Sequence, residues 1–153
     1  MHESWPEFIK MINNQPVDFL KIKPSMQALA KNVVQHKKRL GGNFAVAQAV
    51  PNRLLRDAMK EVLGPECLFV VLRLKKETNA KRVEERHAGD GGGDKAAIKK
   101  TIDLLNGIYD QFEDAQPGEE NCVTVHIGPD DTREDVVNNI QKEVEEFGFN
   151  VKI

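Results

Sequence analysis

Two pairs of arginines at helical spacing are the residues best suited to chemistry in this sequence. Arg53 and Arg56 follow an apolar run and Pro51, which places them in the first turn of a predicted helix. Arg82 and Arg86 are four residues apart and therefore share one face of a second, highly charged predicted helix. Because guanidinium groups bind phosphate and carboxylate through paired hydrogen bonds, both pairs are candidate anion-binding sites.

Each pair also has an ordinary structural explanation. Arg53 and Arg56 could form salt bridges at an exposed helix start, an arrangement about as common as ligand binding. Arg82 and Arg86 could lie on a solvated helix on which Glu84 and Glu85 balance their charge, and this is the more frequent arrangement for such a pattern. Both alternatives remain open from spacing alone.

A glycine-rich segment, residues 89–95, superficially resembles a phosphate-binding loop. A true loop of this kind follows a strand and has Ser or Thr after its lysine. Here the segment follows a predicted helix, Ala96 comes after the lysine, and Asp90 and Asp94 would face the phosphates. We therefore predict no phosphate-binding loop. The glycines near 87–95 suit a hinged lid loop and equally suit an ordinary surface loop.

Other common catalytic sites are disfavoured. The four histidines show no metal-ligand spacing with one another or with Cys67 and Cys122, so no metal site is expected. Both cysteines open apolar runs, where thiols usually pack as small hydrophobic groups. Ser4 and Ser25, the two serines, do not form a nucleophile elbow. Serine hydrolase and zinc chemistry are therefore not expected.

The composition is typical of a single soluble globular domain. Of the 153 residues, 40% are hydrophobic and 30% are charged. The net charge of −2 gives no general attraction to nucleic acid or to an anionic membrane. No apolar stretch approaches the roughly 20 residues that span a bilayer. We expect a cytoplasmic protein without nucleic-acid or membrane partners.

Hydrophobic periodicity predicts alternating strands and helices after residue 43. Helices are predicted at 5–12, from Ser25 to Leu40, at 52–63, at 77–86, around Ile98–Ile108 up to about 112, and from Thr132 onward. Strands are predicted at 44–50, 67–74 and 122–127, with a further edge strand at 147–153. The alternation predicts an α/β domain with a three-layer, mostly parallel sheet flanked by helices.

These elements divide one domain, 1–153, into a helical N-terminal segment, 1–43, and an α/β core, 44–153. Ligands of open parallel sheets bind beyond the carboxyl ends of the strands. The polar residues after positions 50, 74 and 127 are therefore the expected site, and both arginine pairs belong to them.

Three stretches, taken together, resemble the later part of P-loop small-molecule kinases of the gluconate, shikimate and nucleoside-monophosphate types. The stretches are FAVAQAVPNRLLRD, LFVVLRLKKETNAKRVEERH and CVTVHI with the turn that follows it. The resemblance covers residues 25–147 in order. It implies an acceptor-binding role for Arg53 and Arg56, lid contacts to nucleotide phosphates for Arg82 and Arg86, and a turn beside adenine formed by Gly128 and Pro129. ATP with Mg²⁺ is the implied ligand.

The resemblance lacks its first part, because no strand and phosphate-binding loop can be found before Phe44. Phosphoryl transfer depends on that cradle of backbone N–H groups, lysine and Mg²⁺. We therefore expect a truncated or degenerate kinase-like domain that retains at most binding of a nucleotide or small anion and transfers no phosphoryl group alone. Two alternatives remain. One is a kinase active only with upstream sequence. The other is a protein-interaction module that binds a partner, or itself, through an exposed sheet edge or through the N-terminal apolar helix.

Overall fold

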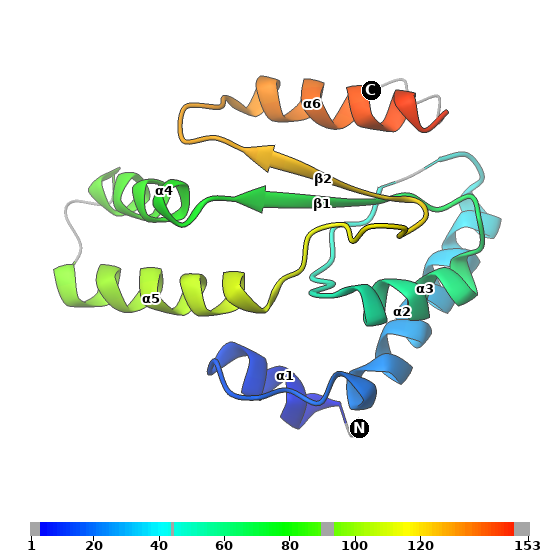
Figure 1. The fold of residues 1–153 in the computed structure, drawn as a ribbon, viewed down its shortest axis with the longest axis horizontal. Coiled ribbons are helices and arrows are strands. Elements are labelled where there is room, and N and C mark those ends of the chain that lie inside the picture. Colours follow the sequence, from blue (N-terminus) through cyan, green and yellow to red (C-terminus); the bar gives the residue numbers. More distant parts are fainter. Residues whose placement is uncertain (1–3, 44, 90–93, 149–153) are drawn as a thin grey trace.

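The computed structural model describes residues 4–43, 45–89 and 94–148. Six helices and two strands lie within these ranges (Figure 1). In chain order they are α1 (Trp5–Ile12), α2 (Phe19–Leu40), α3 (Arg53–Leu63), β1 (Phe69–Leu74), α4 (Lys76–Gly89), α5 (Lys95–Gln111), β2 (Cys122–Ile127) and α6 (Arg133–Glu146). None of these helices is long and apolar enough to cross a membrane.

The two strands form a parallel pair whose register runs from Phe69 opposite Cys122 to Leu74 opposite Ile127. The N–H of Phe69 donates to the carbonyl of Asn121 at 2.9 Å. In a parallel ladder, every second residue directs its backbone groups toward the partner strand. Residues 69, 71 and 73 of β1 therefore face β2, and residues 70, 72 and 74 direct their N–H and C=O groups to the outer edge.

The predicted three-layer parallel sheet is wrong, because the described residues contain only this two-stranded sheet. The predicted strand at 44–50 is also wrong for residues 45–50, which form neither helix nor strand, and residues 45–49 are exposed. An apolar run becomes a buried strand only where a neighbouring strand pairs with it, and no strand of the described chain pairs with residues 45–50. Phe44 lies outside the described residues.

The remaining predicted elements differ less. Strand 67–74 and the four helices predicted after residue 51 are confirmed within a few residues at their ends. The predicted edge strand 147–153 is a turn at residues 147–148, and its other residues lie outside the described ranges. Residues 90–93 of the predicted lid also lie outside them. Helix α2 begins at Phe19, before the predicted start, because Asp18 caps it and accepts from the Leu20 N–H at 3.2 Å.

The main core lies between α2 and α3. Side chains at four-residue spacing on α2 pack against two buried residues of α3; these are Ile22, Met26, Ala30, Leu55 and Met59. Phe69 at the start of β1 packs against this cluster and so joins the helical pair to the sheet. Helix α6 packs on β2, whose Val123, Val125 and Ile127 are buried. Figure 1 shows α6 along the β2 side of the sheet.

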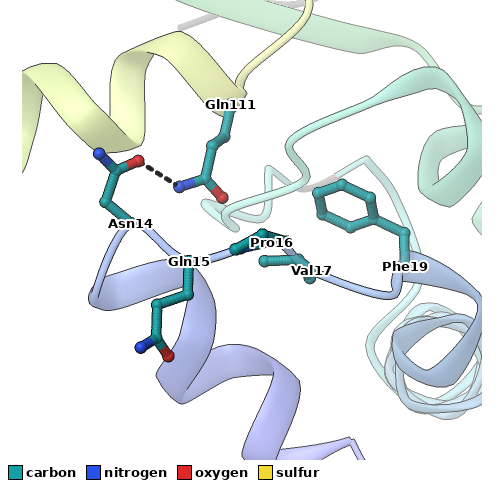
Figure 2. A pocket seen from close by; sticks show the side chains of 6 residues that line it. All are labelled: Asn14, Gln15, Pro16, Val17, Phe19 and Gln111. Atoms are coloured by element: carbon teal, nitrogen blue, oxygen red, sulfur yellow. Dashed lines mark hydrogen bonds between the residues drawn. The ribbon is translucent and has the colours of Figure 1, made fainter.

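The N-terminal helices are joined to α5 through a close contact at Gly107. Asn14 has a left-handed backbone, with φ of 55°, and its carboxamide lies against Gly107. A Cβ atom at position 107 would lie only 2.8 Å from Asn14 Cγ. Gln111 Nε2 donates to Asn14 Oδ1 at 3.1 Å, a bond drawn in Figure 2, and to the Met11 carbonyl at 3.3 Å. Gly107 therefore gives α1 and the turn after it room to contact α5.

Candidate functional site

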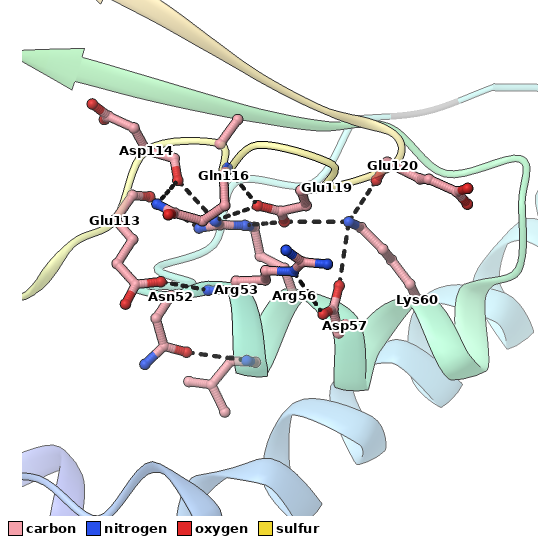
Figure 3. A network of polar contacts seen from close by, with 12 residues as sticks. Asn52, Arg53, Arg56, Asp57, Lys60, Glu113, Asp114, Gln116, Glu119 and Glu120 are labelled. Carbon is pink, nitrogen blue, oxygen red and sulfur yellow. Dashed lines mark hydrogen bonds and ion pairs between the residues drawn. The ribbon is translucent and has the colours of Figure 1, made fainter.

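Arg56 is completely buried and holds the loop before β2 against α3 (Figure 3). Its Nε and Nη2 donate to the two carboxylate oxygens of Glu119 at 2.7 and 2.8 Å. The Nη1 and Nη2 groups also donate to the carbonyls of Glu113 and Asp114 at 3.0 and 3.1 Å. Four hydrogen bonds to the chain itself thus occupy the Arg56 guanidinium in this structure.

The Glu119 carboxylate is the centre of this polar cluster. It also accepts from Lys60 Nζ at 3.2 Å and from the Gln116 N–H at 3.0 Å. Burial alone would raise the pKa of the Glu119 carboxyl, but the hydrogen bonds from Arg56 and Gln116 outweigh it and lower the pKa to about 2. Burial would likewise lower the pKa of Arg56, yet the hydrogen bond to Glu119 leaves it raised. Both groups are therefore charged at neutral pH.

The two cysteines have the character expected of structural residues. Burial raises the pKa of the Cys122 thiol to about 11, although the nearby Arg56 charge acts in the opposite direction. Burial also raises the pKa of Cys67. Since the thiolate is the nucleophile, neither residue is activated for covalent chemistry at neutral pH.

Arg53, the other predicted acceptor-binding residue, lies one turn before Arg56 at the start of α3. Its Nε donates to Asp57 Oδ2 at 3.2 Å, and its backbone N–H donates to Glu113 Oε2 at 3.0 Å. The side chain is partly exposed. Figure 3 shows both arginines on the same helix, with Arg56 directed toward Glu119 and Arg53 paired with Asp57.

The second arginine pair lies near the predicted adenine-side turn. Arg82 Nη2 is 3.4 Å from the Asp131 carbonyl, and Lys81 Nζ donates to Asp130 Oδ1 at 2.9 Å. The Gly128 N–H donates to Asp131 Oδ2 at 2.6 Å. The structure thus brings Arg82 beside the turn that contains Gly128 and Pro129, at the carboxyl end of β2. Acidic Asp130 and Asp131 occupy this turn as well.

The two predicted pairs do not come together. Arg56 is bonded to the loop that precedes Cys122, whereas Arg82 contacts the turn that follows Ile127. Arg86 is exposed one helical turn beyond Arg82. The described residues contain no group of three His, Cys, Asp or Glu side chains placed to bind a metal ion. Within the described chain, nothing in the arrangement of these arginines forms one shared anion site.

A shallow pocket of about 300 Å³ lies between α5 and the segment that joins α1 to α2 (Figure 2). Its lining is mostly apolar and comprises Asn14, Gln15, Pro16, Val17, Phe19 and Gln111. Gln111 Oε1 is buried there without a hydrogen-bond partner among the described residues. This pocket could not be predicted from the sequence, because residues 13–16 indicate a helix end and carry no signal for the contact with Gln111.

The outer edge of β1 has no strand beside it in the described residues. Within the described chain, no hydrogen bond engages the outward backbone groups of Val70, Leu72 and Leu74. Their side chains lie on the same face as buried Val123, Val125 and Ile127, because opposite residues of a parallel pair share a face. Leu72 is 46% exposed, whereas Val70 and Leu74 are half-buried, so this apolar face is only partly covered on β1.

Comparisons with protein-family models, curated protein sequences and solved structures found no match to this chain. The resemblance to P-loop small-molecule kinases and the ATP and Mg²⁺ binding that it implies therefore stay predictions.

Proposed function

We propose that this chain is a protein-binding domain that accepts an extended segment of a partner as a third strand beside β1. The observation that carries the proposal is the row of outward backbone groups on Val70, Leu72 and Leu74, which lack partners in the described chain. A peptide that adds to a sheet edge gains main-chain hydrogen bonds, and its alternate side chains determine specificity.

The isolated sheet supports the proposal. Parallel sheets are normally buried on both faces and contain several strands, and a two-stranded sheet is marginally stable by itself. Here α6 packs on β2, while Leu72 of β1 stays exposed on the same face. A third strand would pair with β1 and could extend the apolar cover to Leu72.

The outer edge also lacks the usual protection against strand addition. Natural edge strands carry lysine, proline, bulges or inward charges that prevent pairing. The three outward positions of β1 are Val70, Leu72 and Leu74, all aliphatic. The strand's one charged residue, Arg73, belongs to the opposite face, where its guanidinium stacks 3.9 Å from the Tyr109 ring centroid and donates to the Tyr109 carbonyl. On the face of Leu72 an approaching strand therefore meets no charge on β1.

The partner segment can be described by its chemistry. On the face of Leu72 it should present aliphatic side chains at alternate positions, which would pack beside Leu72 and continue the layer formed by Val125. A charged residue at those positions would be desolvated without a counter-charge. The proposed ligand is thus an uncharged, alternating apolar strand of about six residues, the length of β1.

A pair of proline substitutions tests the proposal. Leu72→Pro removes an outward N–H and keeps the ladder, whereas Val71→Pro removes an N–H that bonds β2. The probe is a fluorescent peptide that has the sequence of β2 with Ser in place of Cys122. This sequence is chosen because β2 already pairs with the inner edge of β1. Fluorescence anisotropy should show binding to the wild type and at least a tenfold loss in Leu72→Pro.

Leu72→Ala is the matched control, since it trims the side chain and retains the N–H. It should bind the β2-sequence peptide more tightly than Leu72→Pro does. Thermal unfolding should place Leu72→Pro near the wild type and Val71→Pro far below it. Equal peptide binding by the wild type and Leu72→Pro, or no binding by the wild type, would refute the proposal.

A further inference from the structure

We infer that the partner strand comes from a second copy of this chain and is the segment 45–50, exchanged reciprocally so that each copy completes the other's sheet. The inference rests on the proposed function and names its ligand. It assigns a role to an apolar segment that the fold leaves exposed.

The segment is an apolar run that pairs with no strand in the described chain. Its sequence, Ala-Val-Ala-Gln-Ala-Val, is uncharged, and residues 45–49 are exposed, with Val46 at 50%. In the described part of the chain, no hydrogen bond joins residues 45–50 to another residue. An exposed apolar run of this kind usually marks an interaction site.

Donor and acceptor match in length and in charge. The segment and β1 both contain six residues, and the outward positions of β1 are aliphatic. Pairing them buries no charge and so avoids the desolvation cost that charged strands incur. The segment thus meets the description of the ligand given above, without any sequence from outside the chain.

The area is sufficient for a stable dimer when the exchange is reciprocal. An isolated strand of this size exposes roughly 800 Å², from the scaling of unfolded-chain surface with mass. If about half of that area is buried, and a similar area on the acceptor, then two exchanged strands bury about 1,600 Å², a standard size for a specific interface. A single exchange would bury only about half as much, at the size of a crystal contact.

Both elements belong to one packed body, which a two-fold exchange requires. Val50, the last residue of the segment, packs against the α2–α3 core, and Phe69 at the start of β1 packs against the same core. The Pro51 carbonyl, just after the segment, accepts from the Glu113 N–H at 2.6 Å. The segment is thus fixed at its end. In the dimer, segment 45–50 of each copy would pair with β1 of the other, so both copies use the same surfaces, as in an isologous dimer.

Complementation between two blocked chains tests the inference. Ala47→Pro with Gln48→Pro blocks the donor, because neighbouring N–H groups point to opposite edges and one of the two must face β1. Leu72→Pro blocks the acceptor. Sedimentation equilibrium should show a dimer for the wild type and monomers for each blocked chain alone. Their equimolar mixture can form only one of the two exchanges, so it should form a heterodimer only at concentrations far above those at which the wild type dimerises.

Ala47→Ser with Gln48→Ser is the matched control, since it keeps both N–H groups, and it should still dimerise. A monomeric wild type at high concentration, or a donor-blocked chain that dimerises like the wild type, overturns the inference. If β1 still binds the β2-sequence peptide in either case, only the second copy is excluded as the partner. If that peptide also fails to bind, the proposed function fails with it.

Discussion

Arg56 and Glu119 are buried together and joined by two hydrogen bonds of 2.7 and 2.8 Å, although 63 residues separate them in the sequence. Their side chains are 1% and 0% exposed. The pair fixes the loop before β2 against α3, and β2 in turn holds β1. Together with the packing of Phe69 on the α2–α3 core, this ion pair positions the sheet, and hence its outer edge, on the helices.

Removing either partner of this pair should greatly lower the free energy of unfolding. Arg56→Ala or Glu119→Gln leaves a buried charge without its counter-ion, which typically costs about 3–5 kcal/mol. Urea denaturation monitored by circular dichroism measures this loss. Lys99→Ala, which breaks an exposed pair with Asp103, is the control and should change little. A Glu119→Gln midpoint equal to that of Lys99→Ala would contradict the assignment.

Acid should remove the contribution of Glu119 to stability. Its pKa is about 2 in the folded chain, below the ordinary value of 4.5. A lowered folded-state pKa means that the stabilisation is fully present above the unfolded pKa and is lost as the pH falls from about 4.5 toward 2. The stability difference between the wild type and Glu119→Gln should therefore shrink over that window. A difference independent of pH between 6 and 2 would count against the lowered pKa.

The Cys122 thiol should report on the opening of this cluster. Because its pKa is raised to about 11 and the residue is buried, it should react slowly with iodoacetamide at neutral pH. Mass spectrometry after timed labelling should find Cys67, which is only half-buried, modified first. Arg56→Ala should speed labelling of Cys122. Faster labelling of Cys122 than of Cys67 in the wild type would show that the cluster is open.

Substitution of Gly107 should reveal the contact between the N-terminal helices and α5. Gly107→Ala places a Cβ atom 2.8 Å from Asn14 Cγ, and such overpacking costs about 1–3 kcal/mol. In an Asn14→Gly background the clash disappears, and the alanine should then stabilise α5 by about 0.5–1 kcal/mol. Urea denaturation of the wild type, Gly107→Ala, Asn14→Gly and the double variant gives this double-mutant cycle. Equal effects of Gly107→Ala in both backgrounds would exclude the contact.

The helices and two of the strands could be predicted because their signals are local. Trp5–Ile12 and Arg53–Leu63 have a strong apolar face, and Cys122–Ile127 is a short aliphatic run between turn residues. Segment 44–50 gives the same kind of signal, yet it is not a strand over its described residues. A strand also requires a neighbour, and nothing in its own residues shows whether that neighbour exists.

The candidate sites were harder to predict for a similar reason. Arg56 has the spacing of a ligand-binding residue, but its partner Glu119 lies in a distant loop that the pattern of α3 does not indicate. The exposed sheet edge was one of the alternatives from the sequence. Which edge and which residues form it became clear only from the ladder register, which assigns Val70, Leu72 and Leu74 to the outside.

The measurement that tests the central claim most directly is backbone amide exchange of β1, followed by NMR in dilute protein. The N–H groups of Val70, Leu72 and Leu74 should exchange quickly, and those of Val71 and Arg73 slowly, because only the latter bond β2. Addition of the β2-sequence peptide should slow the first group selectively. Protection of all five amides without peptide, or no change when it is added, would contradict the proposal that β1 accepts a third strand.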